Sequence, residues 1–438
     1  MIYRLLLFLC IAASCFAQTA TRALTILHCN DLHARFLPDS RNLGGFAEYA
    51  TVIRRETAGC QSCIVMNAGD LVQGSPVSTI FRGVPVYQVA NKLGIQVSTL
   101  GNHEFDYGWQ TILKFFQVAK FPTVSANVVD DSGKLLARYP YLIKKVNGIR
   151  VAVIGAVMGN LVSNYLVAGL AGPWHALPVV ETVQKYVDEI GDRADLIVVL
   201  GHIQPAERLD ILRKVPKVAV VVTGHSHRGL DKAEVVDGRV GVEAKAYGVE
   251  LGRLDMQVDV AHRSVASWDW KKIPVDSRRV KGAPDVKKVI DKWEAKVSRI
   301  VDVPIGESKR EIAGAELKLL MERAMADEMH ADFSYMNQGG VRDRLPQGKL
   351  LARAVWNIMP FDNKMVLGKF KGSQLSSALT RGRTVDPGRE YIVTMSDFSA
   401  DNESERKLLG ITGLQFETKT VLLRDLLINW IKKKGTLD

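Results

Sequence analysis

Five short polar segments of this chain are rich in metal-binding residue types, and each follows an apolar run. They are Asn30-Asp31-Leu32-His33, Gly69-Asp70, Gly101-Asn102-His103-Glu104, Gly201-His202 and Gly224-His225-Ser226-His227. Of the nine histidines in the chain, five lie in these segments, which is more than casual placement would give. Imidazole, carboxylate and amide groups in this combination are typical of a transition-metal site. The pattern therefore indicates hydrolytic chemistry that depends on bound metal ions.

The apolar runs before these segments have the composition of buried β-strands. The predicted strands are Leu24 to His28, Ile64 to Asn67, Val97 to Leu100, Leu196 to Leu200 and Val218 to Thr223. Open α/β sheets bind ligands at the carboxyl ends of their strands. We therefore expect all five polar segments to meet at that edge of one sheet.

Two divalent cations in one site need a shared anionic ligand and terminal ligands that leave room for water and phosphate. Asp70 suits the shared position. The terminal ligands predicted for one ion are Asp31, His33 and His227, and those for the other are Asn102, His202 and His225. This donor set favours zinc, manganese or iron over magnesium, and zinc or manganese is the first choice. Taken singly, each of these residues would more often be a turn residue or a core histidine, so the prediction depends on the whole set.

The same segments, with Phe105 to Gly108 continuing the third, resemble the calcineurin-like metallophosphoesterases. The stretch from Gly101 to Gly108 is most similar to the 5'-nucleotidase / UDP-sugar hydrolase branch. The resemblance continues through Met336-Asn337-Gln338-Gly339-Gly340-Val341-Arg342 and Ile358-Met359-Pro360-Phe361-Asp362-Asn363. It implies an α/β fold, namely a layered α/β sandwich of the metallophosphoesterase type followed by a smaller α+β domain.

The resemblance also implies catalytic roles for two residues beside the metal ligands. His103 matches the histidine that assists attack on phosphorus by a metal-activated water, and Asp106 matches the carboxylate that orients it. A carboxylate bonded to one imidazole nitrogen fixes the tautomer and supports positive charge on the ring. The alternative for Asp106 is a helix or turn cap.

In this family the second domain captures the nucleoside end of the substrate. Asn337 and Arg342 match its substrate loop, and Phe361 matches its first base-stacking aromatic residue. Taken alone, Arg342 would more often form a surface ion pair, and Phe361 would more often pack in a core. Two stretches depart from the family pattern. The stretch around Arg310 differs, so Arg310 is only a weak phosphate-binding candidate. The stretch Phe398 to Ser404 differs where the family has its second stacking aromatic residue. Phe398 and Phe416 are the candidates for that second contact. With Phe361 alone, discrimination among bases should be weak.

The length of 438 residues exceeds the usual size of a single hydrophobic core, so we expect two domains. The predicted divisions are a metallophosphoesterase domain at 18–275, a helical linker at 276–302 and a substrate-binding domain at 303–438. The linker helix, Asp285 to Arg299, could equally be an ordinary surface helix. Further predicted elements are helices at Val179 to Glu189, Glu316 to Met329 and Val421 to Lys433, and strands at Phe333 to Met336 and Met365 to Phe370.

The N-terminus has the features of a signal peptide over residues 1–17. A short basic start precedes the apolar run Leu5 to Phe16, and Cys15-Phe16-Ala17 forms a cleavage site. A lipoprotein anchored through Cys15 is the alternative. No later run is long enough for a membrane helix, and Cys60 and Cys63 could form a disulfide after export. We therefore expect a periplasmic or secreted protein without stable membrane insertion.

The net charge of +11 raises the question of nucleic-acid binding. The basic residues are dispersed among many acids and form no stripe interleaved with aromatic residues, so small anionic substrates are favoured over nucleic acid. The sequence thus predicts an exported dinuclear-metal phosphoesterase acting on 5'-nucleotides, with UDP-sugars and cyclic nucleotides as further candidates. The alternatives are a dimanganese hydrolase acting on sulfur-carrier adducts and a non-catalytic exported binding protein. No oligomeric state is indicated.

Overall fold

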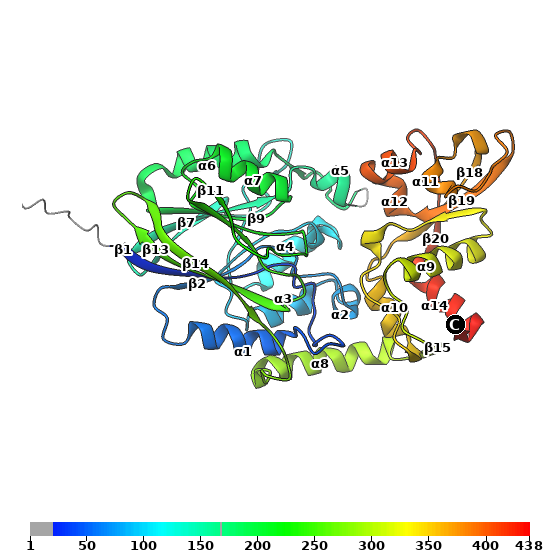
Figure 1. Cartoon of the computed structure of the whole chain (residues 1–438), viewed down its shortest axis with the longest axis horizontal. Helices are drawn as coiled ribbons and strands as arrows, with labels where there is room; N and C mark the ends of the chain where they lie inside the picture. The colour runs from blue at the N-terminus through cyan, green and yellow to red at the C-terminus, as the bar shows by residue number, and fades with distance from the viewer. Residues whose placement is uncertain (1–20, 167–168) are drawn as a thin grey trace, which may run out of the picture.

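Two six-stranded sheets form the centre of the N-terminal part of the chain (Figure 1). The computed structural model describes residues 21–166 and 169–438, so the predicted signal peptide and Cys15 lie outside the described residues. The first sheet has the order β14-β13-β1-β2-β3-β4, formed by Ser264–Pro274, Glu250–Asp259, Thr21–Cys29, Cys63–Asn67, Val97–Thr99 and Thr123–Val124. The second has the order β11-β12-β10-β9-β7-β6, formed by Glu234–Val236, Arg239–Glu243, Val220–Gly224, Leu196–His202, Ile149–Val157 and Tyr141–Val146.

The alternation of apolar side chains explains why the sheets stack. In β7, Val151 and Val153 point into the core between the two sheets, whereas Ala152 and Ile154 point to the helices outside. Successive residues of a strand face opposite sides of its sheet, so a strand that is apolar at every position must be covered on both faces. The second sheet is therefore buried between the first sheet and a helical layer.

Helices cover the outer face of each sheet. Those on the first sheet are α1 (Phe46–Thr57), α2 (Pro76–Ile80), α3 (Val84–Ala90), α4 (Trp109–Val118) and α8 (Pro284–Val301). Those on the second sheet are α6 (Val179–Ile190) and α7 (Pro205–Lys214), at the top of Figure 1. The short elements α5 (Leu161–Tyr165), β5 (Val128–Val129) and β8 (His175–Ala176) complete this part. The layered α/β fold predicted from the sequence is confirmed.

The prediction that all five polar segments follow strands of one sheet is wrong. All five strands exist, but β1, β2 and β3 belong to the first sheet and β9 and β10 to the second. Their parallel pairing, β1 with β2 and β9 with β10, brings their carboxyl ends to the same side within each sheet. The polar segments meet because the two sheets stack with these ends together. An apolar run reveals that a strand is buried, but it does not reveal which sheet the strand joins.

Helix α8 connects the two parts of the chain and also packs into the first. Val286, Ile290, Val297 and Val301 are buried in the same core as α1 to α4. Figure 1 shows α8 running below α1 toward the second part. There, Arg353 donates hydrogen bonds to Asp302 at 2.6 Å and, from a second nitrogen, to Glu294 at 2.8 Å. The predicted linker helix is therefore an integral part of the first helical layer.

The C-terminal part combines two small sheets with six helices. One sheet has the order β16-β19-β18-β20 (Phe333–Tyr335, Glu390–Ser396, Lys364–Lys371, Glu417–Leu422), and the other β17-β15-β21 (Gly348–Leu351, Pro304–Ser308, Thr436–Leu437). The helices are α9 (Gly314–Met329), α10 (Ala352–Ile358), α11 (Ser377–Thr380), α12 (Asp397–Asp401), α13 (Glu403–Leu409) and α14 (Leu423–Lys434). The last predicted helix started too early, because Val421 and Leu422 belong to β20. The α+β character of this part is confirmed.

Two smaller expectations are also tested here. Cys60 and Cys63 form a disulfide with a Cα to Cα distance of 5.6 Å, as predicted. Among the described residues, no helix has both the length and the apolar character needed to cross a membrane.

Candidate active site

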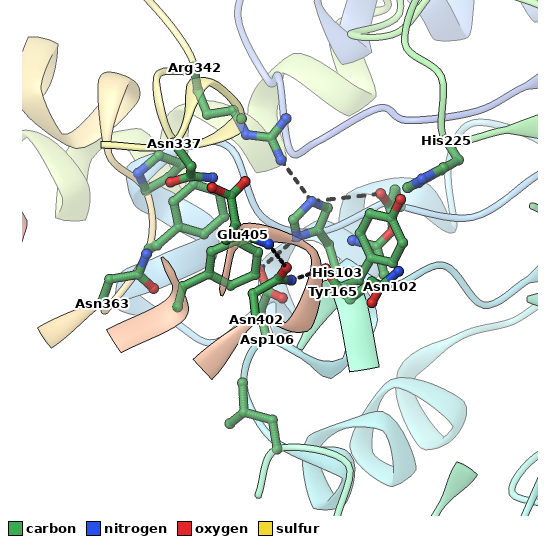
Figure 2. A pocket seen from close by; sticks show the side chains of 18 of the residues that line it. Asn102, His103, Asp106, Tyr165, His225, Asn337, Arg342, Asn363, Asn402 and Glu405 are labelled. Atoms are coloured by element: carbon green, nitrogen blue, oxygen red, sulfur yellow. Dashed lines mark hydrogen bonds and ion pairs between the residues drawn. The ribbon is translucent and has the colours of Figure 1, made fainter. Parts of the chain in front are cut away.

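A cavity of about 400 Å³ lies between the N-terminal and C-terminal parts (Figure 2). The first part contributes metal-binding residue types to its wall, including Asp70, Asn102, His103, His225 and His227. The second part contributes amide, aromatic and charged side chains: Asn337, Arg342, Phe361, Asn363, Phe398, Asn402 and Glu405. A site of this size and mixed lining is typical of small-molecule binding.

The seven predicted metal ligands stand at or directly after strand ends. Five of them have left-handed backbone conformations, with φ of 51° at Asp31, 47° at His33, 54° at Asp70, 90° at His225 and 63° at His227. Non-glycine residues adopt such φ values at a cost in conformational energy, and the strain persists only where the surroundings enforce it. Backbone bonds between the segments do so: Asp31 donates to the carbonyl of Gly69 at 3.0 Å, and His33 donates to that of Asp70 at 3.1 Å.

Four of the predicted ligands come together closely enough to hold one cation. Single donor atoms of Asp31, His33, Asp70 and His227 all lie within 4.8 Å of one another. The Nε2 atoms of His33 and His227 are 3.0 Å apart, and His227 Nε2 lies 3.5 Å from a carboxylate oxygen of Asp31. Two imidazoles and two carboxylates fit a divalent transition metal in both number and type.

The remaining predicted ligands are Asn102, His202 and His225. His202 Nε2 lies 3.1 Å from Asp70 Oδ2, and the ring centroids of His202 and His225 are 5.2 Å apart. The buried Asp70 Oδ2 and His202 Nε2 have only each other as close polar partners, and the buried Asn102 Oδ1 makes no hydrogen bond. Buried polar atoms without partners call for an explanation, and a second cation that shares Asp70 would give Asn102 Oδ1 a partner. His225 points less directly at the proposed second cation, because its Nε2 lies 3.1 Å from the side-chain amide of Gln204.

The pKa values of the site follow from burial and from the crowding of charges. Burial lowers the pKa of His225 to about 3 and that of His227 to about 2, which favours the neutral form of both imidazoles. Burial disfavours the charged form of Asp70, but the neighbouring His202 and His103 rings hold its pKa well below the usual value. Neutral imidazole and ionised carboxylate are the forms in which these groups bind metals.

Asp31 and His202 show the same crowding. Burial, followed by the Asp70 carboxylate, raises the pKa of Asp31 to about 7, although His202 opposes this shift. Burial lowers the pKa of His202, but the Asp70 and Asp31 carboxylates outweigh it and raise that pKa to about 10. Two buried carboxylates at one point thus favour positive charge between them, either as a proton on His202 or as a cation.

His103 stands between this group and the second domain. Its Nδ1 lies 2.8 Å from Asp106 Oδ2, and its Nε2 lies 2.8 Å from Arg342 Nη2 (Figure 2). A guanidinium only donates, so in this geometry Nε2 accepts and the Nδ1 proton is donated to Asp106. Burial lowers the pKa of His103, but the Asp106 and Asp70 carboxylates outweigh it and raise that pKa above its usual value, with Arg342 opposing them.

Glu104 belongs to the third polar segment, but the sequence suggested no role for it. The structure shows that this buried carboxylate accepts backbone hydrogen bonds from Asp70 at 3.1 Å, Leu71 at 2.9 Å and Gly101 at 2.6 Å. Glu104 therefore fixes the loop that presents Asp70. Gly101 is required in this arrangement, because a Cβ added there would lie 2.1 Å from Asp70 Oδ1. The Gly-x-x-Glu spacing of Gly101 and Glu104 was the available signal.

The predicted substrate residues of the second domain are brought to the cavity. Asn337 is 7% exposed and its Oδ1 has no hydrogen-bond partner. The Arg342 guanidinium lies 5.3 Å from the centroid of Phe361, whose ring centroid is 5.9 Å from that of His103. Arg342 therefore contacts the proposed catalytic residue His103 as well as lining the substrate cavity.

The other candidates of the second domain divide into two kinds. Phe398 lines the cavity, as do Asn363, Asn402 and Glu405, which the sequence did not single out. Phe416 instead packs against Phe370 in the core of the second domain, with ring centroids 5.0 Å apart. Arg310 pairs with Glu316 at the surface and does not line the cavity, so it is not a phosphate ligand here.

Comparison with known proteins identifies the families that the two parts of the chain match. Residues 24–229 match the calcineurin-like phosphoesterase family, and residues 299–420 match the 5'-nucleotidase C-terminal domain. The chain belongs to the 5'-nucleotidase family. The model that residues 24–229 match is that of a phosphoesterase domain. This confirms the family resemblance inferred from the sequence.

Individual relatives show how far the similarity extends. The trifunctional nucleotide phosphoesterase protein YfkN of Bacillus subtilis (strain 168) is 26% identical over 416 residues, which cover 82% of this chain and 27% of that protein. The chain thus spans about a quarter of that relative. The crystal structure of a 5'-nucleotidase precursor from Thermus thermophilus superposes with a TM-score of 0.86 at 22% identity, covering 95% of this chain and 97% of the other.

The same fold also occurs in an enzyme with a different name and chemistry. The sulfate thiohydrolase SoxB of Thermus thermophilus superposes with a TM-score of 0.78 at 16% identity, covering 94% of each chain. At this identity the similarity concerns the fold alone. It therefore gives no support to the alternative of a hydrolase for sulfur-carrier adducts.

Proposed function

We propose that this chain is an exported phosphoesterase that uses two divalent cations to hydrolyse 5'-nucleotides to nucleoside and phosphate. UDP-sugars and cyclic nucleotides are further candidate substrates. The observation that carries the proposal is the composition of one cavity. Its N-terminal wall holds a carboxylate and imidazole group, and its C-terminal wall holds Phe361, Phe398 and Asn337. A nucleotide has a phosphate for the first wall and a flat polar base for the second.

Asp70 is the proposed shared ligand of the two ions. Asp31, His33 and His227 would complete one site, and Asn102, His202 and His225 the other, with zinc or manganese as the metal. When bound, the ions supply Lewis acidity that activates a water and offsets charge on the phosphoryl group. The protein contributes by holding these donors at fixed positions, which the hydrogen bonds to Glu104 and the left-handed loops support.

His103, Asp106 and Arg342 are proposed to act on the phosphoryl group itself. Asp106 holds the Nδ1 proton of His103, so that Nε2 faces the cavity. Arg342 has donors for phosphoryl oxygens and lies beside that nitrogen. With a phosphate between them, Arg342 and the imidazolium form of His103, protonated at Nε2, would stabilise negative charge as it moves toward the leaving oxygen.

The nucleoside end is proposed to lie against the second domain. Phe361 offers one aromatic face, and Phe398 is the candidate for the second. The unpartnered Oδ1 of Asn337 would accept a hydrogen bond from a donor on the base. This assignment makes the substrate a nucleotide rather than a simple phosphate ester.

Export is proposed from the predicted signal peptide together with the Cys60 to Cys63 disulfide. Disulfides persist in oxidising compartments such as the periplasm or the extracellular space. Mass spectrometry of the protein recovered from each cell fraction tests this: loss of the first 17 residues supports secretion or a periplasmic location. A diacylated Cys15 would instead establish the lipoprotein alternative.

The decisive experiment for the activity combines metal analysis with a substrate screen. Purified protein is loaded with zinc or manganese, and phosphate release is measured for four nucleoside 5'-monophosphates, a UDP-sugar, a cyclic nucleotide and an aryl phosphate. We expect two ions per chain and the highest kcat/KM for 5'-monophosphates. Turnover of a thiosulfate-type substrate alone would refute the proposal, and binding without hydrolysis in the metal-loaded protein would favour the binding-protein alternative.

A further inference from the structure

Ser226 stands between two of the proposed metal ligands, His225 and His227, and is bonded to a carboxylate behind the cavity wall. Its Oγ donates a hydrogen bond to Glu243 Oε1, and its backbone N–H donates to the same oxygen at 3.2 Å. Glu243 is the last residue of β12 and is fully buried. A buried carboxylate therefore holds the short turn that carries both histidines.

Glu243 is not an isolated buried charge. Arg208 on α7 donates from Nη1 to Glu243 Oε2 at 2.6 Å and to the hydroxyl of Thr223 at 2.8 Å. The other side of the same guanidinium bonds Glu234 at 2.8 and 3.1 Å. Arg208 is only 2% exposed, and a Cβ added at Gly241 would lie 3.3 Å from its Cδ. The glycine thus leaves room for the arginine to reach the carboxylate.

The residue after Glu243 makes a second connection to the metal-binding loops. The side chain of Asn30 donates to the carbonyl of Ala244 at 2.8 Å and accepts from its N–H at 3.2 Å. The same amide nitrogen donates to Asp31 Oδ2 at 2.7 Å. The end of β12 is therefore bonded on one side to the loop of Asp31, which follows β1 of the first sheet, and on the other to the turn of His225 and His227, which follows β10 of the second.

We infer that Glu243, charged and fixed by Arg208, is a positioning residue that holds the ligands of both metal ions in register across the two sheets. The inference rests on the proposed metal centre. His225 and His227 have φ of 90° and 63°, conformations that a free turn would leave. Ser226 is not in the proposed ligand set, so its hydroxyl acts on the metals only through this turn.

A stabilising role in folding alone would not require this arrangement. Replacing a buried ion pair by apolar residues of similar volume is often neutral for stability or favourable. The hydrogen bonds do fix the orientation of the Glu243 carboxylate. One of its oxygens accepts hydrogen bonds from the hydroxyl and the N–H of Ser226, and the other accepts them from Arg208 and Thr223. Partners behind metal ligands typically change metal affinity by roughly 10- to 100-fold when they are removed.

The test compares Ser226→Ala with Ser308→Ala in the full-length protein. Ser308 is also buried, and its hydroxyl donates one hydrogen bond at 2.7 Å, but it lies in the second domain away from the cavity. Dissociation constants for zinc and for manganese are measured by chelator competition, and melting temperatures are measured with excess chelator. We expect Ser226→Ala to weaken metal binding by about 10- to 100-fold, and Ser308→Ala to leave it unchanged, with comparable melting temperatures for the two metal-free variants.

Glu243→Gln and Glu243→Ala provide the graded comparison. The glutamine keeps an acceptor oxygen for Ser226 but loses the charge that fixes Arg208, so it should retain more metal affinity than the alanine. Wild-type affinity in Ser226→Ala, or equal losses in Ser226→Ala and Ser308→Ala, would overturn the positioning role, whatever the folding of the Glu243 variants. A wild-type protein that binds neither metal would instead refute the metal centre itself, which is a separate result.

Discussion

The two walls of the cavity are built in different ways. On the N-terminal wall, Asp31, Asp70 and His202 are fully buried and stand at the ends of strands. On the C-terminal wall, Arg342, Phe361 and Phe398 are half-buried and stand on loops or at the start of a short helix. Backbone hydrogen bonds join loops within each wall, such as Asp31 to Gly69 in the first and Arg342 to Ile358 in the second, and the Thr79 hydroxyl donates across to the carbonyl of Pro360 at 2.8 Å.

This difference suggests a division of labour. Catalytic groups must be held within a fraction of an ångström of their working positions. Rigid strand ends provide this precision, as do buried side chains that bond the loops from behind. Substrate recognition can use side chains on loops, which vary more easily between relatives. Substitutions on the first wall should therefore change metal binding and rate, and those on the second should change substrate affinity. Arg342 is the test case, because it belongs to the second wall but contacts His103 on the first.

The largest effect is expected from Asp70→Ala. Without the shared carboxylate, two cations would repel each other in one pocket, so both metal content and activity should be lost. The lost charge stabilisation corresponds to several kcal/mol, or at least about 10³-fold in rate. Metal per chain, determined by elemental mass spectrometry, and phosphate release check this outcome. Asp237→Ala, at an exposed turn, is the control; two retained ions in Asp70→Ala would rule out the shared ligand.

The second prediction separates catalysis from metal binding on the same wall. His103→Ala should keep both ions, because His103 is not in the proposed ligand set, and should reduce kcat by about 10²- to 10⁴-fold. Asp106→Asn should give a smaller loss, since the imidazole remains but its tautomer is no longer fixed. The same metal analysis and single-turnover rates decide the matter. Loss of an ion in His103→Ala would make this residue a ligand and not a catalytic group.

Arg342→Ala tests whether the two walls are functionally separate. The contact with His103 places its guanidinium beside the reacting phosphate, so kcat and kcat/KM should both fall. Loss of a hydrogen bond to a charged group is worth about 1.5 to 3 kcal/mol, which is roughly 10- to 150-fold. Arg344→Ala is a nearby control whose partner is Glu311. A rise in KM at constant kcat would instead make Arg342 a binding residue remote from the reacting phosphate.

The smallest effects are expected from the two phenylalanines. Phe361→Ala and Phe398→Ala should each raise KM for nucleotides by the value of one stacked contact, about 1 to 3 kcal/mol. Ribose 5-phosphate, which has no base, should be affected much less. KM values for four nucleotides and ribose 5-phosphate provide the measurement. If Phe398→Ala changes nothing, Phe361 stacks alone, and the predicted similar efficiency for purine and pyrimidine nucleotides should hold.

Most of the N-terminal wall could be predicted from the amino-acid sequence alone. Strands β1, β2, β3, β9 and β10 could be predicted from apolar runs, and the polar residues that end each run identified the ligand candidates. This works because both signals are local: burial of a strand appears as consecutive apolar residues, and a ligand must follow directly where the strand ends. The disulfide was also predictable, since a loop of two residues separates its cysteines.

How these pieces combine could not be predicted from local sequence, because it depends on the folded structure. Which sheet each strand joins, the burial of Glu104 and Glu243 behind the loops, and the meeting of Arg342 with His103 all depend on contacts between residues far apart in the chain. The C-terminal wall shows this most clearly, because Phe398 and Phe416 have the same side chain and were equal candidates in the sequence. One lines the cavity and the other fills a core. Local composition measures how apolar a residue is, whereas its role depends on which surface the fold leaves beside it.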